Sequence, residues 1–285
     1  MSKSTHFIGQ PLLGQLLSLI DQVDVHRISK KHGGEHYVKH FDAWHHLVTM
    51  LYAIIMRFDS LREIQLSMTA ESRKLSHLGL TKIPKRSTLS DANVRRSEVI
   101  FGELYATLYD KHKGVLSSDS RNRGSTPSWL RKLKIMDSTT ISLFSNLVFK
   151  GVGRNPKRGK KKLISLLTND FEMPQQDIID IYRKRWMIET LFKQLKQNFP
   201  LRYFYGESAN AIKIQVWCTL IANLLLMLIK RSVRRSWSFS GLATMIRNLM
   251  MYYVNHKSIL EYPEKDWDLM IEEVIRPPNH LSLFD

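Results

Sequence analysis

Apolar residues in the first 115 positions of this 285-residue chain recur at the three- and four-residue spacing of amphipathic helices. The pattern is present in residues 7–20, twice within residues 41–78, and again in residues 83–108, and no convincing strand pattern interrupts it. A helix with one apolar stripe must bury that stripe against another element. We therefore predict that this part of the chain is all-helical, with Ser60 capping the helix that follows it.

The pattern changes after residues 117–128, which are rich in Ser, Gly, Asn, Arg and Pro and which we interpret as a linker. Strand-like runs follow, and then long helical patterns. The runs lie at 133–136, 141–149 and 163–167, and the helical patterns at 175–197, 211–230 and 242–254. We predict a mostly helical α+β fold in four parts: a helical domain (1–78), a helical DNA-binding-like region with the linker (79–128), a core (129–255) and an acidic tail (256–285).

The most apolar stretch, residues 216–229, holds about 14 residues, short of the roughly 20 that a membrane-spanning helix needs. We interpret it as a buried core helix in which the lone cysteine, Cys218, is inert. A single cysteine forms no internal disulfide, which fits a reducing compartment. Met1–Gln10 has no apolar run behind a basic head, so we expect no signal peptide. These features predict a cytoplasmic, nucleoid-associated protein without a membrane partner.

The chain carries 43 Lys and Arg against 26 Asp and Glu, a formal net charge of +17. Such an excess attracts polyanions, of which nucleic acid is the commonest. A ribosome- or membrane-surface-associated protein is the alternative that the charge leaves open. Two basic groups are candidate DNA contacts: the run Lys157, Arg158, Lys160, Lys161 and Lys162, and the pair Lys85 and Arg86 beside a helix-turn-helix-like segment that also holds Arg95 and Arg96. A solvated loop is the alternative for the first group, and a charged helix surface for the second.

Three histidines, His32, His36 and His40, are four residues apart, as zinc ligands on a helix can be. Gly33 and Gly34 break the helix that this spacing requires, so we expect no metal there.

Four polar residues share one face of the helix predicted at 175–197. At about 100° per residue, Tyr182, Arg185, Glu189 and Lys196 fall within about 60° of one another. The apolar residues cluster about 100° away and form the expected buried side: Ile181, Ile188, Leu191, Phe192 and Leu195. An ordinary amphipathic helix with an i,i+4 pair between Arg185 and Glu189 is the alternative.

The spacing Tyr-x2-Arg-x3-Glu-x6-Lys of these residues matches the YREK signature of DDE insertion-sequence transposases of the IS-four family. The segment Met136-Asp137-Ser138-Thr139-Thr140 resembles the first catalytic motif of the same family. The resemblance implies an RNase H-like core and cut-and-paste transposition at the terminal repeats of double-stranded DNA, and it leaves a homodimer on DNA open. It also implies roles for five residues: Asp137 and Glu189 as catalytic ligands of two Mg²⁺ ions, and Tyr182, Arg185 and Lys196 as contacts to the DNA ends.

The sequence departs from the family in the middle of the core. The family needs a second Asp between the first Asp and the Glu, but no acidic residue lies between Asp137 and Asp170, and only 52 positions separate Asp137 from Glu189. We interpret this as an internal deletion near residues 160–163 that leaves a truncated RNase H-like core at 129–255. We therefore expect a chain that is inactive alone. The alternative is a non-catalytic DNA-binding or dimerising protein that inhibits intact copies.

Overall fold

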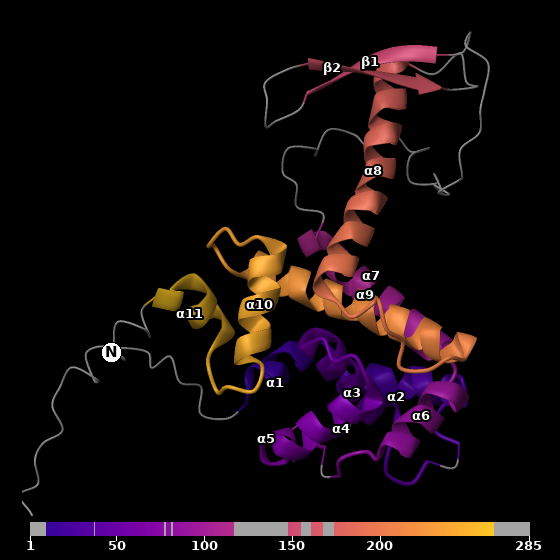
Figure 1. The fold of residues 1–285 in the computed structure, drawn as a ribbon, viewed down its shortest axis with the longest axis vertical. Helices are drawn as coiled ribbons and strands as arrows, with labels where there is room; N and C mark the ends of the chain where they lie inside the picture. The colour runs from indigo at the N-terminus through magenta and orange to yellow at the C-terminus, as the bar shows by residue number, and fades with distance from the viewer. Residues whose placement is uncertain are drawn as a thin grey trace, which may run out of the picture. The chain divides into compact units, whose positions relative to one another are not determined.

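The computed structural model describes residues 10–36, 38–76, 78–80, 82–116, 148–154, 161–167 and 174–264 (Figure 1). The chain divides into two compact units, one formed by Met1–Ser118 with Leu195–Asp285 and the other by Asp119–Gln194. The described residues are mostly helical, as predicted from the apolar spacing.

The first unit is built from helices on both sides of the second unit in the chain. Before it come α1 (Leu12–Leu17), α2 (Gln22–Lys31), α3 (Ala43–Met56), α4 (Leu61–Ala70), α5 (Ser72–Ser76), α6 (Arg86–Arg95) and α7 (Val99–Leu116). After it come the last residues of α8 (Gln175–Asn198), then α9 (Ala209–Ser232), α10 (Phe239–Leu249) and α11 (His256–Glu261). The predicted cap at Ser60 is confirmed, because its side chain accepts a hydrogen bond from the backbone N–H of Glu63.

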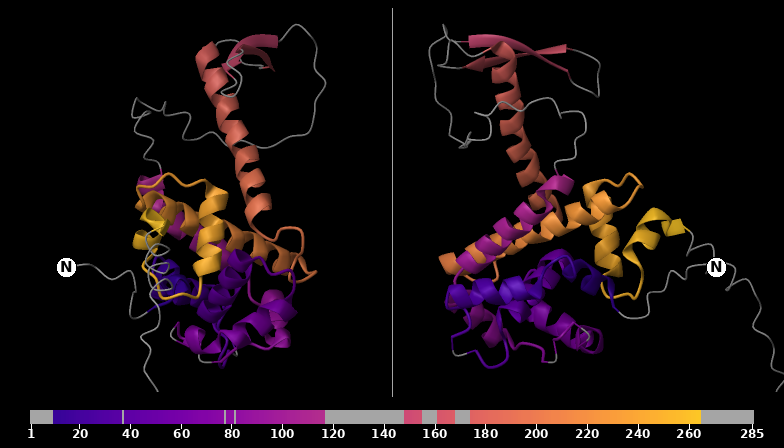
Figure 2. Two further views of the ribbon diagram at one scale, coloured as in Figure 1. Left: turned by 60° about the vertical axis from the view of Figure 1, so that its left-hand side comes forward. Right: turned by 180° about the vertical axis from the view of Figure 1, so that it is seen from behind.

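Helix α9 is the centre of the first unit and packs against α3, α6, α7 and α10 (Figure 2). It is long and apolar enough to cross a membrane by length and composition alone, but 61% of its most apolar window is buried inside the protein. Cys218 lies on this helix, is fully buried and has a raised thiol pKa because burial disfavours the thiolate. The apolar stretch is therefore a core helix here, as predicted.

The close approach of α7 to α9 depends on Gly102. A methyl group at Gly102 would lie 3.0 Å from the indole of Trp217, so alanine there would require the ring to shift by a few tenths of an ångström. The indole N–H of Trp217 donates to a Glu98 carboxylate oxygen at 2.8 Å, which fixes the ring beside α7.

The compact units do not follow the order of the predicted parts. Helices α9, α10 and α11 pack in the same unit as the N-terminal helices, and α11 lies where the acidic tail is predicted. The reason is that the apolar faces of α3 and α7 are covered by α9, which begins 153 positions after the end of α3 and 93 positions after the end of α7. The functional boundaries at 78, 128 and 255 stay a prediction.

The second unit contains an antiparallel hairpin of β1 (Val148–Arg154) and β2 (Lys161–Leu167) and most of α8. The register runs from Val148 opposite Leu167 to Arg154 opposite Lys161. The strand predicted at 163–167 is confirmed, and the run at 141–149 reaches the described residues only at its end. The alternative of a solvated loop for the basic run does not hold for Lys161 and Lys162, because both residues pair with β1 and begin β2.

Candidate nucleic-acid interface

Helix α8 is continuous from Gln175 to Asn198, so the helical spacing assumed for the YREK residues holds along its length. Tyr182 and Glu189 are half-buried and Lys196 is exposed, while for Arg185 the structure describes only the backbone, within the same helix. The predicted apolar side is confirmed at Leu195, which is buried, and is wrong at Phe192, which is 51% exposed. Phe192 lies on the edge of the apolar stripe, nearer to the polar face.

Several predicted site residues lie outside the described residues, namely Asp137, Lys157, Arg158 and Lys160. The structure therefore does not test whether Asp137 meets Glu189. Among the residues that the structure does describe, no group of three or more His, Cys, Asp or Glu side chains could hold a metal ion. His32, one of the three histidines, has its Nε2 2.7 Å from Glu103 Oε2. Gly33, with φ of 68°, ends the helix there.

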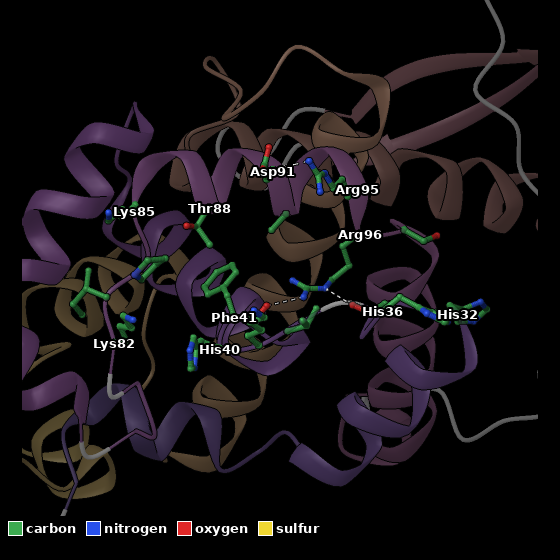
Figure 3. Close-up of a pocket in the computed structure, with 18 residues that line it drawn as sticks. His32, His36, His40, Phe41, Lys82, Lys85, Thr88, Asp91, Arg95 and Arg96 are labelled. Atoms are coloured by element: carbon green, nitrogen blue, oxygen red, sulfur yellow. Dashed lines mark hydrogen bonds and ion pairs between the residues drawn. The ribbon is translucent and has the colours of Figure 1, made fainter.

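The first unit contains a pocket of about 780 Å³ whose lining is strongly basic (Figure 3). We call it the basic pocket. Its cationic and titratable lining residues come from the loop after α2, the loop before α6 and α6 itself: His32, His36, Lys39, His40, Lys82, Lys85, Arg95 and Arg96. Asp91 is the carboxylate of this lining and lies 3.8 Å from Arg95. A concave surface with this charge excess concentrates phosphate-bearing ligands.

The predicted DNA contact Lys85 lines the basic pocket, and Arg86 follows it at the first position of α6. Helix α6 buries Leu89 and Asn93 and exposes a polar face on its other side. The exposed positions are Arg86, Ser87, Thr88, Asp91, Val94 and Arg95. An exposed helix face with hydroxyl, carboxylate and guanidinium groups has the donors and acceptors that contact base edges in a major groove.

Arg96 fixes one wall of the basic pocket. Arg96 is buried, with an exposed fraction of 6%. Its side chain lies between Phe41 and His36 in Figure 3. Its Nε donates to the carbonyl of Gly34 at 3.2 Å and its Nη2 to the carbonyl of Phe41 at 2.8 Å. Burial lowers the pKa of Arg96, and the nearby carboxylates of Glu35 and Asp42 act in the opposite direction. The guanidinium thus ties the histidine-rich loop to the end of α6.

A buried polar network supports the same wall from inside the unit. His46 is fully buried, and its Nε2 lies 2.8 Å from Asn93 Oδ1 on α6. Burial, together with the nearby charge of Arg96, lowers the pKa of His46 to about 3, so the ring is neutral at pH 7. The aromatic rings of Phe41 and Phe101 pack beside it. Sequence analysis missed this role of His46, because no sequence pattern shows that its partner Asn93 lies on another helix, 47 positions away.

Sequence analysis also missed Lys39 and Lys82 as members of the basic pocket. They lie on two loops more than 40 residues apart in the chain, which meet only in the folded unit. The one available signal was the basic, histidine-rich composition of residues 30–40.

Residues 8–81 match a family model described as a domain of unknown function, DUF4372. Parts of the chain are also similar to proteins named as transposases. One is y4zB of Sinorhizobium fredii, 35% identical over 105 residues, which cover 34% of this chain and 28% of that protein. Another, from Synechocystis sp., is named for insertion sequence element IS4SA and is 43% identical over 54 residues, or 19% of this chain and 16% of that protein.

A third relative, from Geobacillus stearothermophilus and named for insertion sequence element IS5377, is 33% identical over 63 residues, 22% of this chain and 17% of that protein. The matched parts thus span less than a third of the length of each of these relatives. No solved structure matches the chain significantly. The matched segments are therefore similar to transposases, two of which are named for insertion sequence elements.

Proposed function

We propose that this protein is a DDE-type DNA transposase by descent, of the YREK insertion-sequence kind, and that this copy binds DNA but is inactive alone. The observation that carries the proposal is the unbroken helix α8, which keeps Tyr182, Glu189 and Lys196 at the spacing of the YREK signature. The similarity to proteins named as transposases supports it independently.

In this proposal Asp137 and Glu189 bind Mg²⁺, because carboxylate oxygens are the ligands that this hard cation prefers. The bound ions would supply activation of the attacking oxygen and stabilisation of the leaving oxygen. Tyr182, Arg185 and Lys196 contact the phosphates of the DNA ends, since guanidinium, ammonium and phenol groups donate to phosphate oxygens.

The basic pocket and the exposed face of α6 form a second DNA contact. Lys85 and Arg86 lie at its edge. Lys161 and Lys162, at the start of β2, remain candidate DNA contacts of the other unit. A homodimer on the terminal repeats is part of the proposal.

The missing second Asp favours a second candidate function. A site with two of its three carboxylates compensates the repulsion between two Mg²⁺ ions poorly. A chain that still binds the element ends without cutting them would act as a non-catalytic inhibitor of intact copies, either by occupying DNA or by forming mixed dimers.

The test is incubation of the full chain with DNA carrying the ends of its own element, in Mg²⁺ and in Mn²⁺, with nicking and binding scored together. We expect binding without cleavage. The variant Glu189→Gln is compared with Glu207→Gln, which removes an exposed carboxylate outside the YREK face. Cleavage that only Glu189→Gln abolishes would show an active transposase and contradict the deletion argument, whereas a chain that neither binds nor cleaves would contradict the proposal itself.

A further inference from the structure

One corner of the first unit holds a backbone conformation that its residue disfavours. Arg57 ends α3 with φ of 64° and ψ of 41°. Among the described residues, no other residue except glycine has a positive φ. A left-handed residue at a helix end is ordinarily glycine, because a Cβ strains the backbone in that conformation. The long side chain of Arg57 is exposed, so the strain is not offset by packing of that side chain in the core.

A second arginine lies beside Arg57. Arg247, on α10, donates from Nε to the carbonyl of Ile55 at 2.8 Å and from Nη2 to the carbonyl of Asn198 at 3.3 Å, so it binds the C-terminal ends of α3 and α8. Burial lowers the pKa of Arg247, and the positive charge of Arg57 lowers it further. Two guanidinium groups thus repel each other at this corner, and an anion bound there would relieve the repulsion.

The loop between α8 and α9 places two aromatic side chains at the same corner. Tyr203 is 56% exposed and Phe204 is 43% exposed. The hydroxyl of Tyr205, the next residue, donates to the carbonyl of Phe58 at 2.7 Å, and Phe58 directly follows Arg57. The hydrogen bond therefore joins the residue after the two exposed rings to the residue after Arg57.

The loop is held from beneath by Gln215, which is fully buried on α9. Its amide nitrogen donates to the carbonyls of Pro200 and Tyr203, at 3.0 and 2.8 Å, and its amide oxygen accepts from the N–H of Tyr205 at 2.8 Å. The backbone that carries the two exposed rings is thus fixed by three hydrogen bonds to one buried side chain.

We propose that Tyr203 and Phe204 stack on unpaired bases of a DNA strand, while Arg57 and Arg202 contact the phosphates beside those bases. The inference rests on the proposed function, since it takes DNA as the ligand. Aromatic rings next to cations are the combination that binds single-stranded nucleic acid, because every base has an exposed π-face once it is unpaired. Bases inside an intact duplex are stacked on one another and present no such face.

The charge of the corner favours DNA over a second copy of this chain. Residues 57–63 and 196–207, together with Arg247, carry five cations, and the carboxylates among them are Asp59, Glu63 and Glu207. Two copies of one net-positive surface repel each other, whereas a nucleic-acid strand is attracted. Asp59 and Glu63 lie near the phenol of Tyr205, on the α4 side of the corner.

The experiment measures the binding of the full chain to a fluorescent duplex of about 20 base pairs, either blunt or with a tail of about five thymidines. We expect the tailed duplex to bind about tenfold more tightly, and the double variant Tyr203→Ala, Phe204→Ala to lose this advantage while it still binds the blunt duplex. The control Tyr262→Ala removes a ring that is 65% exposed elsewhere in the unit, and it should keep the advantage. A fluorescent base analogue in the tail should be quenched by the wild-type chain and not by the double variant.

The variant Arg57→Gly separates a DNA contact from a structural role. Glycine suits a φ of 64°, so the variant should be at least as stable as the wild type toward urea. It should nevertheless bind the tailed duplex about threefold more weakly, with a slope of log K against log salt that is lower by about one. Lys111→Gln, which removes an exposed charge on α7, should leave the tail advantage unchanged.

Equal affinity for the two duplexes, or a tail advantage that survives in the double variant, would overturn this inference and leave the proposed function standing. So would a wild-type chain that dimerises in sedimentation through a contact that the double variant lacks. Failure to bind either duplex would overturn the proposed function as well.

Discussion

The side-chain amide nitrogen of Asn210 lies 2.8 Å from the carbonyl oxygen of Arg96 and 2.8 Å from that of Asn93. The first turn of α9 therefore satisfies the backbone carbonyls at the end of α6, while the amide oxygen of Asn210 accepts from the N–H of Glu98 at 3.1 Å. One side chain thus connects the central helix to the wall of the basic pocket.

Replacing Asn210 by Ala should lower the free energy of unfolding by about 1–3 kcal/mol, because partly buried carbonyls at the end of α6 lose their donor. Urea denaturation measures the change. Asn210→Asp is the second variant to compare. It keeps an acceptor for the N–H of Glu98, removes the donor to the two carbonyls, and places a negative charge beside them. It should be no more stable than Asn210→Ala, and a near wild-type stability of either variant would contradict this account.

The stability of the first unit should fall as the pH drops from 7 to 5. His46 has a folded-state pKa of about 3, below its ordinary value of 6.5. Between these two pH values the unfolded state binds a proton at His46 and the folded state does not. Its contribution is fully present above pH 6.5 and is lost progressively below it, by about 2 kcal/mol at pH 5.

The variant His46→Gln should be less stable at pH 7 but should show a flatter dependence on pH, measured by urea denaturation at several pH values. His256, whose pKa is also lowered by burial, contributes with the same sign, and His45, whose pKa is raised by its hydrogen bond to Asp42, contributes with the opposite sign. Both are present in wild type and variant, so the difference between the two curves reports His46. Parallel curves would count against a neutral buried ring.

Neutralising the basic pocket should weaken DNA binding through electrostatics. The triple variant Lys39→Gln, Lys82→Gln, Lys85→Gln removes three exposed cations from its lining. We expect about tenfold weaker binding at 0.1 M salt and a salt slope lower by about three, at roughly one unit for each lost phosphate contact. Fluorescence anisotropy across a salt series checks both numbers.

The matched control replaces three exposed lysines away from the pocket, Lys30, Lys111 and Lys257, with Gln. Both triple variants have the same net charge, so an equal loss in both would mean that only the total charge of the chain matters.

Helix α7 offers a pair of glycines that tests the packing against α9. Gly114→Ala should stabilise the unit by about 0.5–1 kcal/mol, because alanine favours a helix and nothing lies within 4 Å of the added methyl group. Gly102→Ala has the same gain in helix propensity, but its methyl group contacts the indole of Trp217 too closely. This variant should therefore be less stable than Gly114→Ala by about 1–2 kcal/mol. Thermal or urea unfolding measures the difference, and a shifted tryptophan emission in Gly102→Ala alone would locate its cause. Equal stabilisation by both substitutions would show that α7 and α9 are not in tight contact at Gly102.

Local features of the fold followed from the sequence where a short pattern sets them. The cap at Ser60, the helix end at Gly33 and the long helix 175–198 each depend on residues within one or two turns. The burial of Leu195 and Cys218 followed from apolar spacing in the same way.

Features set by distant parts of the chain did not follow. The joining of α9 to the N-terminal helices and the loops that form the basic pocket both depend on contacts between residues far apart in sequence. The positive φ of Arg57 could not be predicted from the sequence. A left-handed helix end is usually marked by glycine, and this position is not a glycine.

The two-part construction of the first unit has a consequence for how such a chain changes length over evolution. The segment from Asp119 to Gln194 leaves the first unit after α7 and returns to it before α9, and these two helices pack on each other directly. Residues can therefore be removed from or added to the intervening segment without breaking the contacts that hold the helical unit together. Under the proposed function, a shortened catalytic segment and an intact helical unit would coexist in one chain, so loss of the chemistry would leave the proposed DNA-binding surface in place.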